Sequence, residues 1–199
     1  MKISTIGSGR IGGTLGRKWA GAGHSVFFSS RNPQSAEMQA LLAEAGPNAR
    51  AGLPQEAFAF GDVILLAMSG TALESVLKDA GDLNGKVLID ATNRFDGISN
   101  SQAAMRLQPG AKVVKAFNSV GFEVLEDPMF GNEPASMMMA GDDADAKQIV
   151  AQLISDVGLE PVDLGDASVI SALEGAVGAI WMPLSRQYGR GVALRVLKR

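Results

Sequence analysis

The residues best suited to bind a ligand lie near the N-terminus, where glycines recur at a fixed spacing. Gly7, Gly9 and Gly12 form the pattern G-x-G-x-x-G between an apolar stretch, Lys2–Ile6, and a segment with helical spacing. In this setting the first glycine permits a tight turn, the second lets a pyrophosphate approach the backbone, and the third lets the helix pack closely. The helix N-terminus then offers N–H groups to the phosphates. We predict a dinucleotide-binding turn; the alternative is a tight turn without a ligand.

The polar residues after the next apolar stretch bear on which dinucleotide binds. Ser25–Ser29 is rich in strand-forming residues and is followed by Ser30, Arg31 and Asn32, with no acid among them. NAD-binding proteins usually carry Asp or Glu here to accept the ribose hydroxyls, and that acid would repel a 2′-phosphate. Arg31 can pair with a phosphate, and Ser30 and Asn32 can add hydrogen bonds. We therefore predict NADP(H); the alternative is an Arg31 that stacks on adenine without a strict preference.

Polar residues also follow the later apolar runs. The runs Asp62–Met68, Lys86–Asn93 and Lys112–Phe117 suit parallel strands that are covered on both faces. Asn93 ends the second run and Asn118 follows the third, at the strand ends where open α/β sheets bind ligands. An asparagine there can hold a carboxamide or a ribose hydroxyl. The alternative is an ordinary residue of a turn.

Candidates for acid–base chemistry are few. Lys115 is close to the expected cleft and is a candidate catalytic residue together with Asn118, although a lysine there can also snorkel to solvent at the sheet edge. We expect the single histidine, His24, to be structural. Asp90 is expected to accept hydrogen bonds in a turn, and Glu174 to pair with a basic residue. No metal site is expected, because the chain has no cysteine and one histidine.

The elements that must position these residues alternate between strand and helix from residue 2 to about residue 165. This pattern predicts an α/β fold with a Rossmann-type, doubly wound, mostly parallel sheet in a domain of residues 1–165. Residues 166–199 are expected to form a small helical extension, with a helix over Ser168–Trp181 that breaks at Pro183. The extension would cover the cleft or mediate dimerisation. The other expected helices span Ile11–Ala22, Gln34–Ala45, Pro54–Phe60, Thr71–Ala80, Ser99–Leu107 and Asp143–Val157, and the other strands Ala49–Ala51, Ala135–Ala140 and Pro161–Leu164.

Composition excludes some classes of partner. The chain has 199 residues, 46% hydrophobic and 20% charged, with a formal net charge of −3. A mildly acidic surface argues against general binding to nucleic acid or membranes. The absence of cysteine fits a reducing, cytoplasmic location. No apolar run approaches the ~18 residues that a membrane span needs, so we expect no membrane partner.

Three stretches resemble one enzyme family. "IGSGRIGGTLGRKWAGAGHSVFFSSRNP" is similar to the N-terminal segment of the NADPH-dependent F420 reductases, the F420H2:NADP oxidoreductases. "KAFNSVG", residues 115–121, resembles the same family and the reductase domain of the STEAP metalloreductases. "PVDLGD" and "SALEGAVGAIWMPL" resemble the family's C-terminal part. The resemblance covers most of the chain.

The resemblance implies an NADP-binding Rossmann domain, with an F420 or flavin ring stacked on the nicotinamide as co-substrate. Ser35 departs from the family pattern, which has a second basic residue for the 2′-phosphate at this position. The site residues implied by the resemblance are Ser8, Gly9, Arg10 and Ile11 for the pyrophosphate, Ser30 and Arg31 for the 2′-phosphate, Met68, Ser69, Thr92 and Asn93 for the ribose and adenosine side, and Ala116, Phe117 and Asn118 near the nicotinamide.

Three functions remain open from the sequence. The first is an NADP-dependent oxidoreductase that passes hydride directly to a small planar redox acceptor, in a cleft lined by Phe117, Asn118 and the C-terminal helix. The second is a dehydrogenase or imine reductase, for which a larger C-terminal domain is typical. The third is a non-enzymatic NADP(H)-sensing module. We expect the protein to be a homodimer.

Overall fold

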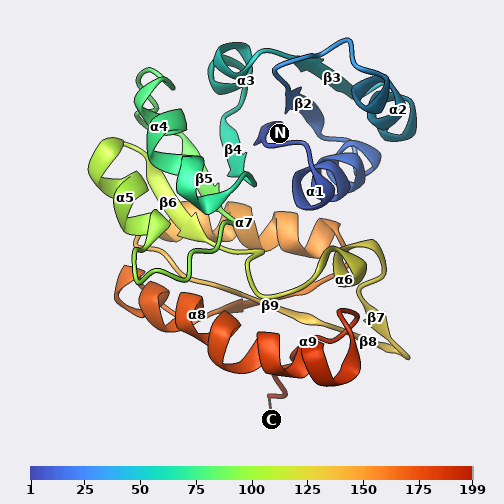
Figure 1. The fold of residues 1–199 in the computed structure, drawn as a ribbon, viewed down its shortest axis with the longest axis vertical. Helices are drawn as coiled ribbons and strands as arrows, with labels where there is room; N and C mark the ends of the chain where they lie inside the picture. The colour runs from blue at the N-terminus through green and yellow to red at the C-terminus, as the bar shows by residue number, and fades with distance from the viewer. Residues whose placement is uncertain (199) are drawn as a thin grey trace.

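The strands assemble into one main sheet with helices on both faces (Figure 1). The computed structural model describes residues 1–198. The main sheet is six-stranded and parallel, in the order β3-β2-β1-β4-β5-β6. The order reverses between β1 and β4, and at such a point the strand ends leave a crevice for ligands. The predicted Rossmann-type fold is therefore confirmed. The strands are β1 (Lys2–Ile6), β2 (Ser25–Ser29), β3 (Ala49–Gly52), β4 (Val63–Leu66), β5 (Val87–Asp90) and β6 (Lys112–Lys115).

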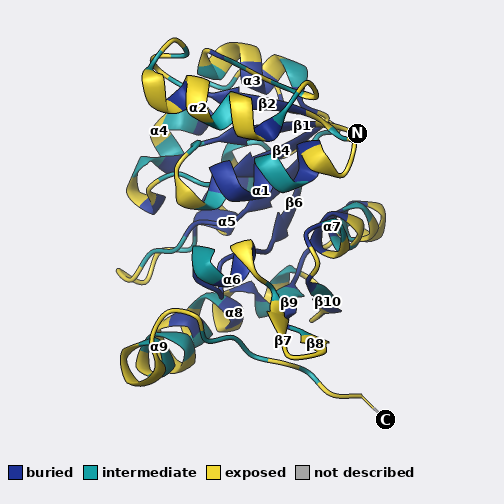
Figure 2. Ribbon diagram, turned by 90° about the vertical axis from the view of Figure 1, so that its right-hand side faces the viewer, coloured by how far each residue is buried: buried dark blue, intermediate teal, exposed yellow. Residues whose placement is uncertain are grey.

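Side chains alternate between the two faces of this sheet. Val63 and Leu65 of β4 belong to one core cluster and Ile64 and Leu66 to the other, and all four are buried. Burial on both faces explains why the strands are apolar runs, and Figure 2 shows the central strands as buried. The first cluster is covered by α1 (Arg10–Gly21), α2 (Ala36–Ala45) and α7 (Ala144–Asp156), and the second by α3 (Pro54–Phe60), α4 (Leu73–Lys78) and α5 (Asn100–Leu107). A short 3₁₀ turn, η1 (Gly70–Ala72), leads into α4.

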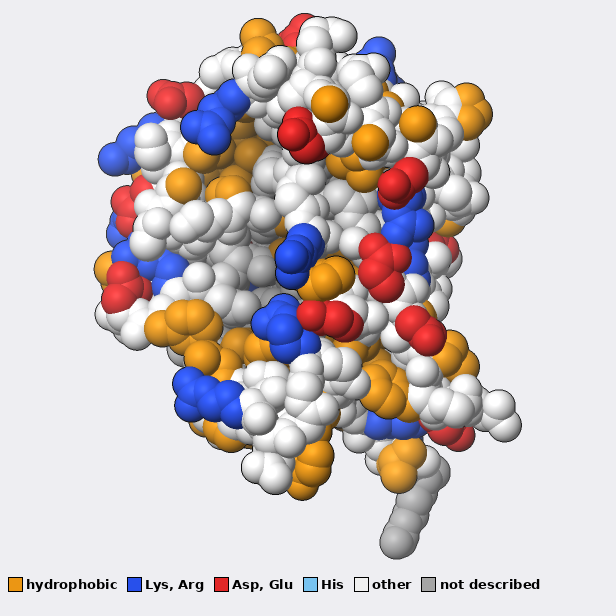
Figure 3. Space-filling view, turned by 45° about the vertical axis from the view of Figure 1, so that its right-hand side comes forward, with side chains coloured by type: hydrophobic (Ala, Val, Ile, Leu, Met, Phe, Trp, Pro, Cys, Tyr) orange, Lys and Arg blue, Asp and Glu red, His pale blue; other side chains and the backbone are white. Residues whose placement is uncertain are grey.

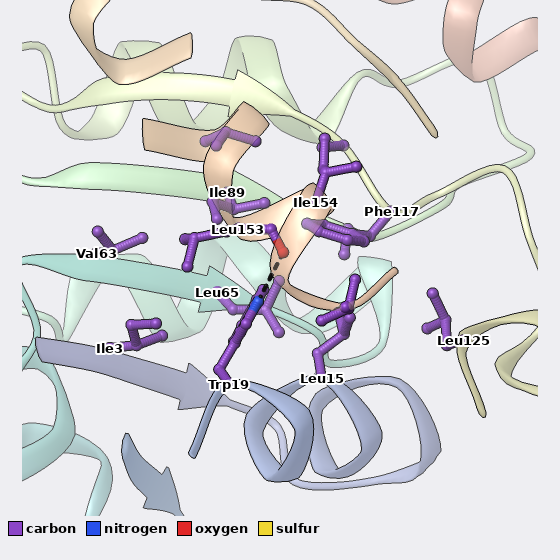
Figure 4. Close-up of a cluster of buried hydrophobic side chains, with 14 of the residues drawn as sticks. Ile3, Leu15, Trp19, Val63, Leu65, Ile89, Phe117, Leu125, Leu153 and Ile154 are labelled. Atoms are coloured by element: carbon purple, nitrogen blue, oxygen red, sulfur yellow. Dashed lines mark hydrogen bonds between the residues drawn. The ribbon is translucent and has the colours of Figure 1, made fainter. Parts of the chain in front are cut away.

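Trp19 joins α1 to α7 within the first cluster (Figure 4). The side chain is fully buried, and its indole N–H donates a hydrogen bond of 2.9 Å to the carbonyl oxygen of Leu153. Its ring meets the ring of Phe117 edge-on at 5.8 Å. A buried donor without a partner costs about 1–3 kcal/mol, so this bond favours one position of α7 on the sheet.

The residues after β6 form elements that the sequence did not predict. They are α6 (Phe122–Glu126) and a short antiparallel pair, β7 (Met129–Phe130) and β8 (Glu133–Pro134). The strands β9 (Ser136–Met139) and β10 (Glu160–Asp163) then pair with each other in a separate two-stranded sheet. A single bridge between Lys115 and Ala140 links β9 to β6. The strand–helix alternation thus continues past the main sheet, and the domain boundary at residue 165 stays a prediction.

The C-terminal helix is continuous, so the break expected at Pro183 is wrong. It runs through η2 (Ala167–Val169), α8 (Ile170–Ala176), a π-helical turn η3 (Val177–Trp181) and α9 (Met182–Tyr188). Proline has no N–H to donate and its ring crowds the preceding turn. The wider π turn ends at Trp181, two residues before Pro183, and makes room for the ring in the first turn of α9.

This helix is also long and apolar enough to span a membrane. Residues Ala167–Tyr188 form a 22-residue helix. An 18-residue stretch of this helix has a mean hydropathy of 1.4, and 17% of that stretch is buried. Length and composition are the only grounds for this observation. The expectation that no apolar run approaches such a length is wrong. The absence of a membrane partner and the homodimer stay predictions.

His24 lies at the end of α1 away from the carboxyl ends of the strands. Its Nε2 is 2.8 Å from Oδ2 of Asp156 on α7, and its Nδ1 is 3.2 Å from the N-terminal ammonium of Met1. These contacts join β1, α1 and α7, which fits the structural role expected for this residue.

A contact between α1 and α6 makes stability depend on pH. Glu126 accepts hydrogen bonds from Arg17 and from Oγ1 of Thr14. The Arg17 bond, followed by the Thr14 bond, holds the pKa of Glu126 below its ordinary value of 4.5. Such a group stabilises the fold above its unfolded pKa, and the contribution is lost as pH falls through the folded pKa.

We therefore expect Glu126→Gln to lower the melting temperature at neutral pH, and the deficit to disappear as pH falls below about 4.5. Thermal scans of both proteins across this range measure the deficit. A deficit of constant size at every pH would contradict this assignment.

Candidate cofactor site

The turn between β1 and α1 is shaped by its glycines. Gly7 has a φ of +99°, and a Cβ there would lie 2.6 Å from the carbonyl oxygen of Ala67. A Cβ on Gly12 would lie 1.9 Å from the carbonyl oxygen of Gly7. By contrast, no atom lies within 4 Å of the place where a Cβ on Gly9 would stand. The fold therefore requires Gly7 and Gly12, whereas Gly9 leaves space for a ligand.

Helix α1 begins at this turn without a side-chain cap. Gly9 is its N-cap residue, and its first turn contains no acidic residue. Helices α2 and α7 instead begin after Ser35 and Asp143, whose side chains accept a backbone N–H. The first N–H groups of α1 therefore have no acceptor from the cap position, and an anion can take that place.

Two alanine substitutions separate the structural glycine from the ligand-facing one. We expect Gly12→Ala to lose about 1–3 kcal/mol of stability or more, because its methyl group overlaps the backbone of Gly7. We expect Gly9→Ala to unfold like the wild type but to bind NADPH at least about tenfold more weakly, because the methyl group fills space that a pyrophosphate needs. Urea unfolding and NADPH titration measure the two effects. NADPH binding by Gly9→Ala at wild-type strength would contradict the assignment of the turn.

A pocket of about 480 Å³ opens beside the turn. Arg31 is exposed at its wall and makes no ion pair with any residue in the range 1–198. The hydroxyl of Ser30 accepts the N–H of Asn32 at 3.1 Å. The structure thus brings the glycine turn, the end of β2 and the end of β4 together. The lining residues are Ile6, Gly7, Ser8, Ser29, Ser30, Arg31, Pro54, Met68, Ala72 and Val76.

Ser35 lies in an adjoining hollow of about 260 Å³, which Ser8, Gly9, Arg10 and Ser30 also line. The Ser35 hydroxyl accepts the N–H of Met38 and so caps α2. Among the described residues of the larger pocket, Arg31 is the only basic one. Specificity for a 2′-phosphate at this pocket would therefore depend mainly on Arg31.

Several of the predicted site residues do not line the larger pocket, among them Asn32, Ser69 and Ile11. Ser69 is exposed beyond the end of β4, and its hydroxyl lies 3.0 Å from that of Thr71. Ile11 is half-buried and packs on the first core cluster, so its contribution at the turn would come from its backbone.

Asn93 and Asn118 meet at the ends of β5 and β6. Nδ2 of Asn93 donates to the backbone oxygen of Asn118 at 2.9 Å, and Nδ2 of Asn118 donates to Oδ1 of Asn93 at 3.3 Å. Oδ1 of Asn118 is buried and has no hydrogen-bond partner among residues 1–198. Because an unpaired buried acceptor is costly, this oxygen is a suitable acceptor for the amide N–H of a ligand.

The backbone at Phe117 explains how Asn118 reaches this position. Phe117 has a φ of +61°, which is uncommon for a residue with a side chain. Its N–H donates to Sδ of Met137 at 3.1 Å, and its ring is buried against Trp19. Ala116 is also fully buried. The Phe117 ring therefore belongs to the core and does not line the expected acceptor cleft.

Lys115 is fully buried, so the expectation that it snorkels to solvent is wrong. Its Nζ donates to Oδ2 of Asp90 at 2.9 Å and to the carbonyl oxygen of Thr92 at 2.6 Å. It also lies 3.1 Å from Oε1 of Glu174. Two hydrogen bonds and two carboxylates therefore hold the ammonium in place, which makes Lys115 a poor candidate for a general base. Glu174 pairs with a basic residue and Asp90 accepts the backbone N–H of Thr92, both as expected, whereas the ion pair of Asp90 with Lys115 was not predicted.

Lys115 and Asp90 belong to a larger buried hydrogen-bond network, whose other members were not predicted from the sequence. Oδ1 of Asp90 accepts the N–H and the hydroxyl of Thr92, and Oδ2 also accepts the hydroxyl of Ser101 at 2.7 Å. Nδ2 of Asn100 donates to Oγ1 of Thr92 at 2.7 Å. The Thr92 hydroxyl therefore bonds to Asp90 and Asn100 beneath the strand ends. The only signal for Asn100 and Ser101 was their position at the start of a predicted helix.

Basic side chains lie at the rim of the hollow that crosses one face of the molecule (Figure 3). The guanidinium of Arg10 is 4.7 Å from the ring centre of Phe122 on α6. Nε of Arg190 donates to Oε1 of Glu123 at 2.8 Å. Partial burial raises the pKa of Glu123, but its own backbone N–H, Arg190 and the charge of Arg10 together hold it below its ordinary value. Arg10 is thus positioned beside the glycine turn by α6.

A third pocket, of about 300 Å³, lies between the loop after β5 and α8. Phe95 and Ile98 of this loop are 67% and 47% exposed and present apolar surface at the pocket wall. The loop begins directly after Asn93, so the pocket is close to the Asn93–Asn118 pair. Its lining residues are Arg94, Phe95, Gly97, Ile98, Ser99, Gln102, Ser171, Glu174, Gly175 and Gly178.

Comparison with known sequences identifies relatives of the chain. Residues 2–94 match the model of a family described as NADP oxidoreductase, coenzyme F420-dependent. The metalloreductase STEAP3 of Rattus norvegicus is 31% identical over 181 residues, which cover 87% of this chain and 35% of that protein. The chain therefore spans about a third of the length of this curated relative.

Solved structures give the same fold. A candidate F420-dependent NADP reductase from Arthrobacter sp. FB24 has a TM-score of 0.88 and 26% identity, with full coverage of both chains. The hypothetical protein SMa0349 from Sinorhizobium meliloti has a TM-score of 0.76 and 31% identity, covering 100% of this chain and 96% of that one. A reductive aminase from Aspergillus terreus in complex with NADPH has a TM-score of 0.72 at 20% identity, covering 94% and 62%, which shows a shared fold alone.

Proposed function

We propose that the chain, whose residues 2–94 match the family model of the coenzyme F420-dependent NADP oxidoreductases, transfers a hydride directly between NADPH and a flavin-like or deazaflavin-like acceptor such as F420. One observation carries the cofactor half of this proposal. Arg31 makes no ion pair with the described residues and stands in a pocket that Gly7 and Ser8 of the glycine turn also line, and no acid lines that pocket. This arrangement fits a dinucleotide with a 2′-phosphate.

The groups that would hold NADPH follow the strand ends in order. The N–H groups at the start of α1 and the side chain of Arg10 would bind the pyrophosphate. Arg31 and Ser30 would bind the 2′-phosphate, with the adenosine in the pocket at the end of β4. Oδ1 of Asn118, which lacks a partner among the described residues, would accept the carboxamide N–H of the nicotinamide.

Bound NADPH supplies a hydride from its nicotinamide C4, and the protein contributes position and exclusion of water. The buried Lys115–Asp90 pair holds Thr92, and so fixes the backbone that leads into Asn93. The loop that carries Phe95 and the C-terminal helix would enclose a planar acceptor in the third pocket. The network offers no free proton donor, which favours direct transfer over acid–base chemistry.

Competing functions make different demands on these residues. A dehydrogenase acting on a hydroxy acid would need a general base, and Lys115 is buried, donates two hydrogen bonds and is ion-paired with Asp90 and Glu174. The likeness to reductive aminases and imine reductases is one of fold, and the chain covers 62% of the reductive aminase. An NADP(H)-sensing module would keep the cofactor pocket but would need no acceptor pocket beside it.

Stopped-flow oxidation of NADPH against F420, FMN, riboflavin and a ferric chelate tests the proposal. We expect rapid oxidation with F420 or a flavin. Tight NADPH binding without turnover by any acceptor would support the sensing module instead. Failure to bind NADPH would contradict both.

A further inference from the structure

Glu174 is the carboxylate that lines the acceptor pocket. It projects from α8 and its side chain is 15% exposed, whereas its partner Lys115 is completely buried. Oε1 of Glu174 lies 3.1 Å from Nζ of Lys115 and accepts the hydroxyl of Ser99 at 3.2 Å. Two contacts on one oxygen, from two different elements, fix the orientation of this carboxylate.

The second oxygen of Glu174 is available to a ligand. Oε2 makes no hydrogen bond with the residues that the structure describes, and it is not among the buried unpaired atoms. The other charged residue of the pocket wall, Arg94, is held by Asp96, with Nε donating to Oδ1 at 3.0 Å. Because Asp90 and Glu174 share one ammonium, the local charge is negative. The wall therefore favours a hydrogen-bond donor over an anion.

The remaining walls suit a flat ring. Phe95 and Ile98 present exposed apolar surface from the loop. Gly175 of α8 and Gly178 of η3 leave the C-terminal helix without side chains where it faces the pocket. A planar heterocycle can lie on such surfaces and direct one edge at Glu174.

We propose that Glu174 is the specificity-determining residue for the acceptor, and that it accepts a hydrogen bond from an imide-type ring N–H. This chemistry selects planar heterocycles with an N–H between two carbonyl groups, the arrangement in the pyrimidine ring of flavins and deazaflavins. It disfavours acidic metal chelates. The inference rests on the proposed function, because it assigns the acceptor class of the same reaction.

The substitution Glu174→Gln reverses the polarity of this contact. Lys115 donates to the amide oxygen of the new residue, so the amide N–H₂ group faces the pocket. A ring N–H then meets a donor instead of an acceptor. Lumiflavin, which carries the imide N–H, and its N3-methyl derivative, which lacks it, are the matched probes.

We expect Glu174→Gln to weaken binding of lumiflavin to the NADP⁺ complex by about 10- to 100-fold, because the lost hydrogen bond is charge-assisted. Binding of N3-methyl lumiflavin should stay within about twofold of wild type, since it makes no such bond. Glu74→Gln removes a carboxylate outside the pocket, paired with Arg106 at 3.5 Å, and should change neither affinity. Flavin fluorescence titration measures all of these values.

The wild-type protein provides a test that needs no variant. It should bind lumiflavin at least about tenfold more tightly than the N3-methyl derivative. Equal wild-type affinities, equal losses for both flavins in Glu174→Gln, or no binding of lumiflavin would overturn the inference. NADPH titration of the same samples is independent of Glu174, so its failure would count against the proposed function itself.

Discussion

Replacing Arg31 with alanine weakens NADPH binding by about 10- to 100-fold and leaves NADH binding nearly unchanged. A charge-assisted hydrogen bond to a phosphate contributes about 1.5–3 kcal/mol, and 1.4 kcal/mol is a factor of ten in affinity. Arg31 is the only basic residue among the described residues of its pocket, and Ser35 is engaged as the cap of α2. The effect of one substitution is therefore large. Fluorescence titration with both cofactors measures it.

Arg50→Ala is the matched control for this prediction. Arg50 stacks over the rings of Phe27 and Phe60 and does not line the cofactor pocket. Its removal should leave the preference for NADPH intact. If Arg31→Ala weakened NADPH and NADH binding equally, Arg31 would contact a part common to both cofactors, and the 2′-phosphate assignment would be wrong.

Lys115→Met lowers the free energy of unfolding by about 3–5 kcal/mol. The substitution leaves Asp90 without its ammonium partner at a position with no solvent exposure, and an uncompensated buried charge has a cost of this size. For a chain of this length the melting temperature falls by roughly 6–20 °C. Urea unfolding and thermal scans both measure the loss.

An exposed lysine on the same strand gives the comparison. Lys112 pairs with Asp143 at 3.0 Å, and both side chains are about one-third exposed. Lys112→Met should cost at most about 1 kcal/mol. Adding Asp90→Asn to Lys115→Met should recover part of the lost stability, because it removes the unpaired charge. Equal losses of unfolding free energy in Lys112→Met and Lys115→Met would contradict the large effect expected from breaking the buried pair.

The N-terminal half of the site could be read from the sequence because its signals are local. Gly7, Gly9 and Gly12 sit within one turn, and their roles depend on neighbours a few residues away. Arg31 follows β2 directly, so its place at the strand end was predictable. Even here the sequence did not show that the Ser35 hydroxyl caps α2. This bond engages the hydroxyl that could otherwise have been a second polar group for the phosphate.

The far end of the site depends on contacts between distant segments. Lys115 was expected to reach solvent, because nothing near it in sequence shows that Asp90 and Glu174 surround its ammonium. The ring of Phe117 was assigned to the cleft, but the positive φ turns it into the core. Pro183 was read as a helix break, whereas the π turn before it lets the helix continue. Each of these outcomes is decided by packing, which local patterns do not encode.

The central claim is that NADPH delivers its hydride directly to a planar acceptor bound beside the Asn93–Asn118 pair. NADPH carrying deuterium at both hydrogen positions of the nicotinamide C4 tests this claim with F420, because a deazaflavin accepts hydride at a carbon whose new C–H bond does not exchange with water. The account predicts deuterium in the reduced F420 after a single turnover. Reduced F420 without the label, or labelled NADPH left unoxidised in the presence of F420, would contradict it.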